Sequence, residues 1–145
     1  MLQIQVKKFN ELTIDQLYEL LQLRSQVFVV EQDCVYQDID SKDQKSLHIL
    51  GLKNNKIIAY TRIFRPGDYF NEASIGRVVV AENERKFKYG HQIMKASINA
   101  IAAHFNTATI IISAQTYLKK FYNNLGFNQI GDGYLEDGIP HIKMQ

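Results

Sequence analysis

The chain has 145 residues, 46% of them apolar, and its 17 basic and 15 acidic side chains give a formal net charge of +2. This length suffices for one domain, residues 1–145, with its own core, and the near-neutral charge argues against a nucleic-acid-binding protein. The single cysteine, Cys34, excludes an internal disulfide and leaves no thiolate set for zinc, so we expect no metal and a cytoplasmic location.

The N-terminal third of the sequence predicts a strand, a helix and a polar loop. Apolar and polar side chains alternate over residues 2–6, as in a half-buried strand, and no stretch has the long apolar run of an export signal or membrane span. Thr13 to Gln16 has capping-box spacing, and the apolar positions after it predict a helix that runs to about Phe28. Glu31 to Lys45 is polar and irregular, so we expect a surface loop that could lie over a cleft.

The middle of the chain predicts an antiparallel meander. Two apolar runs, Leu47 to Leu52 and Ile57 to Phe64, are separated by Asn54-Asn55, a dipeptide that tolerates the positive φ angles of a tight hairpin turn. Ser74 to Ala81 reads as the next strand. With the N-terminal strand, these segments make the first four strands of a sheet.

The C-terminal part predicts a crossover followed by a short helix and a hairpin. Helical periodicity after Gly90, followed by the apolar strand Ala108 to Ser113, makes the fourth and fifth strands parallel. Tyr117 to Leu125 is a further amphipathic segment, with Gly126 suited to the helix C-cap. Two last strands, Phe127 to Ile130 and His141 to Met144, are expected around a turn at Asp137-Gly138.

A basic stretch stands between the fourth strand and the helix that follows it, from Arg85 to His91. Free backbone N–H groups and the positive end of the helix dipole gather at such a place, and four nearby side chains can add positive charge. The stretch therefore suits a phosphate or pyrophosphate. The alternative is a solvated basic helix start, because charge runs often form exposed faces.

Three segments of this chain match a known pattern in order and spacing. They are Val78 to Val80, Arg85 to Gly90 and Phe121 to Phe127, and together they resemble the GNAT acetyltransferase superfamily. Further segments resemble its ElaA-like branch, so that the resemblance spans nearly the whole chain: Leu23-Arg24, Val27 to Gln32, Tyr36 to Asp40 and Glu136 to His141.

The resemblance implies a mixed α/β fold, one layer of sheet flanked by helices and splayed between the fourth and fifth strands by a bulge near Val79. It implies acetyl-CoA as cosubstrate, with the pantetheine arm against Val78, Val79 and Val80 and near the amide of Gln115. Lys88 stands where the superfamily has its first loop glycine, and Gln115 where many relatives have asparagine. The loop residues expected at the pyrophosphate are Arg85, Lys86, Phe87, Lys88, Tyr89, Gly90 and His91.

Two residues are candidates for proton transfer. Tyr122 lies where the superfamily commonly places the tyrosine that protonates the departing CoA thiolate, and a phenol of pKa about 10 can donate to a thiol of pKa about 8.5. The alternative is an aromatic core residue. Glu31, at the end of the first helix, is the candidate base that frees the amine, and its alternative is a solvated or salt-bridged glutamate.

The sequence thus predicts an N-acetyltransferase that acts by direct attack of a primary amine, small molecule or peptide, in a ternary complex. Secondary candidates for the rim of the acceptor pocket are His48, His141, Arg77, Asp38 and Asp40, all of which also have ordinary structural explanations. A non-catalytic acyl-CoA sensor and, against the net charge, a nucleic-acid binder are the alternatives. The sequence leaves the acceptor and the oligomeric state open, and is compatible with a homodimer.

Overall fold

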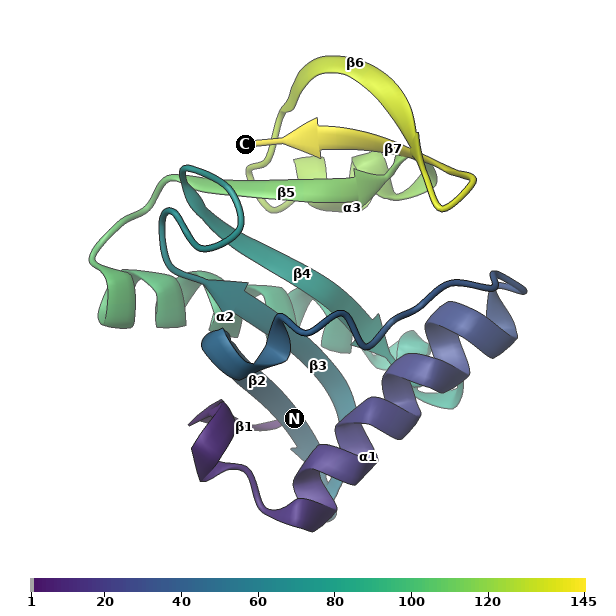
Figure 1. Ribbon diagram of the computed structural model, residues 1–145, viewed down its shortest axis with the longest axis vertical. Coiled ribbons are helices and arrows are strands. Elements are labelled where there is room, and N and C mark those ends of the chain that lie inside the picture. The colour runs from purple at the N-terminus through teal and green to yellow at the C-terminus, as the bar shows by residue number, and fades with distance from the viewer. Residues whose placement is uncertain (1) are drawn as a thin grey trace.

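Seven strands form one mixed sheet in the order β1-β2-β3-β4-β5-β7-β6 in the computed structural model, which describes residues 2–145 (Figure 1). The strands are β1 (Gln3–Lys8), β2 (Leu47–Lys53), β3 (Lys56–Phe64), β4 (Ala73–Val80), β5 (Ile110–Gln115), β6 (Gln129–Glu136) and β7 (Ile139–Met144). The α-helices are α1 (Ile14–Arg24), α2 (Tyr89–Phe105) and α3 (Lys119–Asn123). The predicted class, a single layer of mixed sheet flanked by helices, is confirmed.

The first four strands pair antiparallel in sequence order, as predicted. The β2–β3 hairpin turns at Asn54 and Asn55, whose φ angles of +53° and +64° are those of a type I′ turn. Asparagine tolerates this left-handed conformation better than most residues, and the turn's twist matches that of the flanking strands. The dipeptide therefore sets the pairing of β2 with β3 next to the turn, where Lys53 faces Lys56.

The first helix begins where its capping box predicts but changes its winding before it ends. The Thr13 hydroxyl accepts from the Gln16 amide at 3.0 Å, and the Gln16 side chain accepts from the Thr13 amide at the same distance. The α-helix ends at Arg24, and Ser25–Glu31 continues as a π-helix, so the predicted end at Phe28 is wrong. Valine-rich sequence disfavours tight α-helical packing, and π segments often occur beside functional sites.

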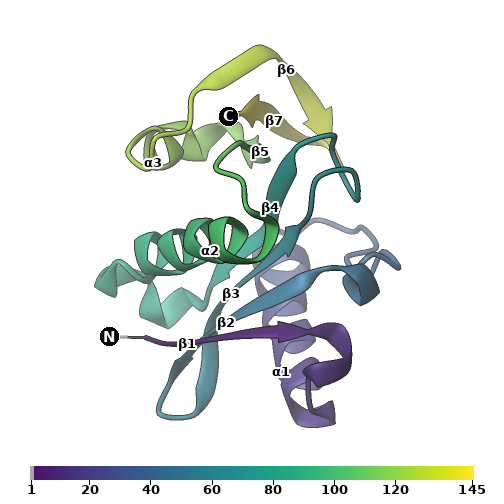
Figure 2. The ribbon, with the colours of Figure 1, turned by 90° about the vertical axis from the view of Figure 1, so that its left-hand side faces the viewer.

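The helices α1 and α2 cover opposite faces of the β1–β4 half of the sheet (Figure 2). Alternating strand residues supply both cores, since Ile49 belongs to the cluster beneath α2 and Leu50 to the cluster beneath α1. Ile93 and Met94 of α2 and Leu20 of α1 are fully buried in these clusters. No helix in the described part of the chain is long and apolar enough to cross a membrane.

The strands β4 and β5 pair in parallel at only two positions, Ala73 with Ile110 and Ser74 with Ile111, and then separate. A bulge in β4 accompanies the separation: Val79 faces Tyr60 and Gly76 faces Arg62, which leaves two residues of β4 opposite one of β3. Arg77, at the bulge, has a φ of +52°. The predicted splay is confirmed, and the bulge expected near Val79 is centred on Arg77 and Val78.

The C-terminal hairpin completes the sheet beyond β5 (Figure 1). Gly126, with a φ of +96°, follows the last turn of α3, in agreement with the predicted C-cap. The strand expected over Phe127 to Ile130 is wrong in its extent, because β6 runs on to Glu136 through an irregularity between Ile130 and Tyr134. Glycines at 131 and 133 interrupt the alternation there, which hid the second half of the strand from sequence reasoning.

Candidate functional site

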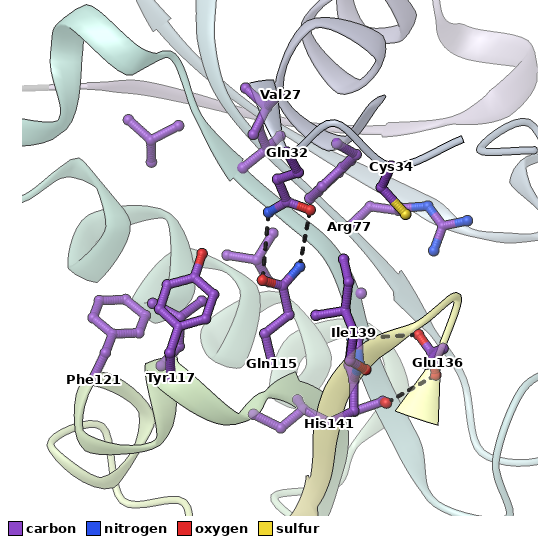
Figure 3. A pocket seen from close by; sticks show the side chains of 18 of the residues that line it. Val27, Gln32, Cys34, Arg77, Gln115, Tyr117, Phe121, Glu136, Ile139 and His141 are labelled. Atoms are coloured by element: carbon purple, nitrogen blue, oxygen red, sulfur yellow. Dashed lines mark hydrogen bonds and ion pairs between the residues drawn. The ribbon is translucent and has the colours of Figure 1, made fainter. Parts of the chain in front are cut away.

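A cleft of about 460 Å³ opens where β4 and β5 separate. One wall is the bulged part of β4, residues 75–80, and another is the end of the π-helix with the residues after it. The opposite wall comes from the end of β5, from α3 and from the β6–β7 turn (Figure 3). The splay between the two strands thus creates a cleft between β4 and β5.

The structure brings most of the predicted site residues to this cleft. Those that line it are Val78, Val79, Val80, Arg85, Gly90, Gln115, Tyr122 and Glu31. The other loop residues, Lys86, Phe87, Lys88, Tyr89 and His91, are not among its lining residues. Tyr89, the first residue of α2, is buried in the core, and the His91 ring lies against Phe121 with centroids 4.9 Å apart. The predicted loop therefore contributes to the cleft mainly through its two ends.

Glu31 and Arg85 form a two-pronged ion pair at the mouth of the cleft. The guanidinium donates to the two carboxylate oxygens at 2.5 and 2.8 Å, and its Nε donates to the Val80 carbonyl at 3.1 Å. The hydrogen bond to Glu31 raises the pKa of Arg85. Of the two readings of Glu31, base or salt-bridged glutamate, this arrangement shows the ion pair.

The start of α2 has the backbone that an anion site needs. Lys88, the residue before the helix, has φ +60° and ψ +28°, the left-handed conformation that glycine adopts without strain. A lysine therefore occupies a glycine-like position of the loop. At Gly90 a Cβ atom would meet the Phe121 ring at 3.2 Å, so the helix start lies close against α3. The amides of the first turn of α2 have no carbonyl within the helix to which they can donate.

Tyr122 is buried on α3 and also lines the cleft. Its ring packs edge-on against Phe121 and Phe127, with centroids 5.0 and 6.2 Å away. Burial raises the pKa of Tyr122 well above that of a free phenol. The hydroxyl therefore stays protonated at neutral pH, which suits a hydrogen-bond or proton donor. The ring packs in the hydrophobic core.

An amide pair spans the cleft from the end of the π-helix to the end of β5 (Figure 3). Gln32 Nε2 donates to Gln115 Oε1 at 3.4 Å, and Gln115 Nε2 donates to Gln32 Oε1 at 3.2 Å. Each amide is the hydrogen-bond partner of the other. A ligand that bonds to Gln115 would have to replace Gln32 as the partner.

Four of the five secondary candidates belong to a buried charge network or to its edge. Asp38 accepts from Arg24 at 2.9 Å and from Arg77 at 2.7 Å, and Asp40 accepts from Arg62 at 2.6 and 2.8 Å. Neither aspartate lines the cleft. The guanidinium of Arg77 lies between the network and the cleft, and the network holds the loop after the π-helix against the sheet.

A third aspartate completes this network. Asp43 accepts from Arg24 at 2.8 Å and from Arg62 at 2.9 Å. Although burial alone raises the pKa of Asp43, the hydrogen bond from Arg24 and the charges of the two arginines outweigh it and lower the pKa. The fourth candidate, His48, lies outside the cleft and bonds to the Tyr60 hydroxyl at 2.6 Å. Asp38 and Asp40 were candidates for the rim of the acceptor pocket with an ordinary structural explanation as the alternative, and the structure shows the alternative, since their partners are arginines.

A polar cluster on β5, β6 and β7 was largely missed by sequence reasoning. It consists of Ser113, Tyr134, Glu136 and His141, and we call it the Glu136 cluster. Ser113 Oγ donates to Glu136 Oε1 at 3.1 Å and is hydrogen-bonded to the Tyr134 hydroxyl. His141 Nδ1 lies 2.7 Å from the Ile139 carbonyl, and its Nε2 lies 3.6 Å from Glu136 Oε2. Only His141 was among the candidates, and only strand pairing brings the four together.

Comparison with known proteins agrees with this geometry. The family model described as "Acetyltransferase (GNAT) domain" matches residues 10–145. Protein ElaA of Escherichia coli is 45% identical over 137 residues, which cover 93% of this chain and 90% of that protein. The crystal structure of E. coli ElaA has a TM-score of 0.91, with 99% and 98% of the two chains covered. An acyl-CoA N-acyltransferase from Pseudomonas aeruginosa, 37% identical with the same coverage, has a TM-score of 0.93.

Proposed function

This chain belongs to the GNAT acetyltransferase family and is an acyl-CoA-dependent acyltransferase, and on that premise we propose that it moves an acetyl group from acetyl-CoA to a primary amine by direct attack in a ternary complex. One observation carries the proposal. The cleft between the separated strands has a helix start with Arg85 at one end and a protonated, buried Tyr122 in its wall.

The backbone of β4 supports the placement of the pantetheine arm. Beyond Ser74 the edge of β4 that faces β5 has no strand partner, so its backbone groups are available to a ligand except the Val80 carbonyl, which accepts from Arg85 Nε. The pantetheine amides can pair with this edge at Val78 to Val80, as an added strand would. The pyrophosphate then reaches the first turn of α2 at Gly90, where unpaired amides and the helix dipole favour negative charge.

Arg85 is placed to exchange partners when the phosphates bind. Its side chain is 42% exposed and that of Glu31 is 26% exposed, so the pair is at the surface of the cleft. Exposed ion pairs contribute about 0–1 kcal/mol, which a doubly charged pyrophosphate can outweigh. We place Arg85 on the phosphates in the complex, with Glu31 released to solvent.

The chemistry requires an oxyanion donor and an acid. β4 bulges at Arg77 and Val78 beside the splay, and we place at Val79 or Val80 the strand amide that donates to the thioester carbonyl as negative charge develops on it. Attack by the amine forms the C–N bond, and collapse breaks the C–S bond. Tyr122 donates its proton to the departing thiolate and regains one from the new amide nitrogen.

A non-catalytic acyl-CoA sensor is the second candidate, and the ion pair of Glu31 favours it. Both carboxylate oxygens are held by Arg85 before acyl-CoA binds, and Glu31 is released to solvent, not to the amine, when the phosphates take Arg85, so it does not serve as a base. If no other group in the cleft accepts the amine's proton, the chain would bind acyl-CoA without turnover. Turnover with any amine separates the two functions.

The test is thiol release from acetyl-CoA in the presence of alkylamines, amino acids and peptide amines, with the acetylated product identified by mass spectrometry. We expect release above the hydrolytic background with at least one amine, in proportion to the acetylated product. Binding of acetyl-CoA without any acetylated amine would replace acetyl transfer by the sensor function. Transfer to a cysteine of the protein before the amine is added would contradict direct attack.

A further inference from the structure

The basic side chains of the cleft are paired with carboxylates, whereas the acidic side chains of the β6–β7 turn are not paired with an arginine or lysine in the part of the chain that the structure describes. Arg85 is bound by Glu31, and Arg77 is bound by Asp38 and Asp40 behind the cleft wall. Within residues 2–145, Glu136 and Asp137 have no arginine or lysine within 4.0 Å. The end of the cleft formed by the β6–β7 turn therefore carries negative charge without a fixed cation.

The hydrogen bonds of the Glu136 cluster fix its proton positions. A carbonyl accepts only, so His141 Nδ1, at 2.7 Å from the Ile139 carbonyl, carries a hydrogen, and when the ring is neutral Nε2 holds the lone pair. The Ser113 hydroxyl donates to Glu136 Oε1, so the Tyr134 hydroxyl donates to Ser113. Two acceptors remain, Glu136 Oε2 and His141 Nε2, and they lie 3.6 Å apart.

These acceptors lie beside the place where the strands begin to separate. Ser113 is two residues beyond Ile111, the last residue of β5 that pairs with β4, and the bulge is on the other side of the splay. Glu136 and His141 extend from the hairpin toward this point, whereas Tyr117 and Phe121 lie at the other end of the cleft, beyond the Gln32–Gln115 pair (Figure 3). The reacting thioester carbon belongs between the two ends.

We propose that the Glu136 cluster is the acceptor site and that it takes an alkylammonium group, with His141 as the group that accepts its proton. This inference rests on the proposed acetyl transfer and names its substrate class. An ammonium has only donors, and the cluster offers it only acceptors: the carboxylate of Glu136 and the free nitrogen of His141. The charge of Glu136 selects the cation.

The proton balance of the reaction follows from this geometry. The bound R–NH₃⁺ gives one proton to His141 Nε2, and the imidazolium formed is held by the Glu136 carboxylate next to it. The neutral amine then attacks the thioester, and its second proton leaves through Tyr122 to the CoA sulfur. The products are the N-alkylacetamide and CoA thiol, and His141 returns its proton to solvent.

The inference predicts discrimination between amines of similar shape. Benzylamine is a cation at neutral pH and aniline is neutral, so the cluster should accept the first and reject the second. A site that only positions an aromatic amine near the thioester, without recognising its charge, would accept both. Burial of Glu136 by a neutral ligand would leave the charge of its carboxylate without a cation and its Oε2 without a donor, which opposes binding.

The test uses the full-length chain with Glu136→Gln, His141→Asn and, as a control for charge on the same strand, Asp132→Asn. Thermal unfolding and acetyl-CoA titration establish that each variant is folded. In Glu136→Gln we expect the KM for benzylamine to rise at least about tenfold, because a hydrogen bond to a charged group is lost, while the KM for acetyl-CoA stays unchanged. In His141→Asn we expect kcat to fall about 100-fold or more. Asp132→Asn should match the wild type.

Binding is measured separately from turnover, by calorimetric titration of butylamine, 1,4-diaminobutane and benzylamine into the protein with CoA present. Glu136-dependent binding without acetylation would support the acceptor site and overturn the proposed transferase activity. Acetylation with the same amine KM in Glu136→Gln, or with equal use of aniline, would overturn the acceptor site and leave the transferase. Neither binding nor acetylation of any of these amines would overturn both.

Discussion

Two sets of arginine–carboxylate contacts in this molecule have the same chemistry and opposite surroundings. In the network behind the cleft, Arg24 is fully buried and Asp43 is 7% exposed, and each group has several partners. At the mouth of the cleft, Arg85 is 42% exposed and has one carboxylate partner, Glu31. The buried set cannot lose a member without leaving a charge in the interior, whereas water can replace either member of the exposed pair.

The difference in burial indicates a structural role for the buried set and a role in ligand binding for the exposed pair. The buried network fixes the loop after the π-helix, and with it one wall of the cleft. The exposed pair keeps Arg85 beside the start of α2, where phosphates are expected and where they can replace Glu31 as its partner. A sequence shows arginines and acids in both places, and burial alone distinguishes the fixed set from the exchangeable one.

The largest effect is expected from breaking the buried set. Arg24→Met keeps much of the side-chain volume but leaves Asp38 and Asp43 short of a partner, so we expect the free energy of unfolding to fall by about 3–5 kcal/mol. Arg85→Met is the matched control and should cost about 1 kcal/mol or less. Urea unfolding measures both. Equal losses would contradict the distinction between the two sets.

Tyr122 is buried like the network but lines the cleft like the exposed pair. Removal of its hydroxyl shows whether its role is structural or catalytic. Tyr122→Phe keeps the contacts with Phe121 and Phe127, so we expect unchanged thermal stability and unchanged acetyl-CoA affinity. Loss of the acid should lower kcat about 100-fold, roughly 2.7 kcal/mol. Steady-state kinetics with saturating amine gives the result, and an unaltered kcat would remove Tyr122 from the acid role.

The exchange of Arg85 between Glu31 and phosphate can be biased by one substitution. Glu31→Gln removes the competing charge, so we expect acetyl-CoA to bind several-fold more tightly, a gain of about 1 kcal/mol, with kcat retained. Arg85→Gln should weaken binding about tenfold. Calorimetry compares the three proteins. Weaker binding in Glu31→Gln would show that the pair must stay closed, and a large loss of kcat would return Glu31 to the role of base.

The smallest effect concerns the backbone of the basic loop. Lys88 adopts a positive φ that favours glycine, so Lys88→Gly should raise the free energy of unfolding by about 0.5–1 kcal/mol. Lys86→Gly, two residues earlier in the short helix Glu82–Phe87, should instead lower it by a similar amount. Thermal unfolding of the two variants decides, and a loss of stability in both would mean that the lysine side chain makes a compensating contact.

Local features of the fold could be predicted from the sequence because nearby residues cause them. The capping box at Thr13 and the turn at Asn54-Asn55 each depend on a few consecutive residues, and both are confirmed. The splay was predicted from the resemblance of the β4 and loop segments to a known family. The π-helix after Arg24 was not, because apolar spacing alone does not reveal a local widening of the helix.

The parts of the site formed by motifs of consecutive residues could be predicted from the sequence, and the parts formed by paired strands could not. Arg85, Gly90 and Tyr122 stand in motifs of fixed order, and all three line the cleft. The Glu136 cluster joins three strands whose register the sequence did not give, since β6 was expected to end at Ile130. The partners of Asp38 and Asp40 were equally hidden, because arginines from α1, β3 and β4 reach them only in the folded chain.

The most direct measurement is a calorimetric titration of acetyl-CoA into the wild-type protein. A cleft with a free strand edge, an open helix start and an exchangeable arginine predicts binding at one site with a Kd in the micromolar range, about 8 kcal/mol. Absence of any binding at about 1 mM, where affinity would be only about 4 kcal/mol, would contradict the account of the cleft and the acetyl transfer built on it.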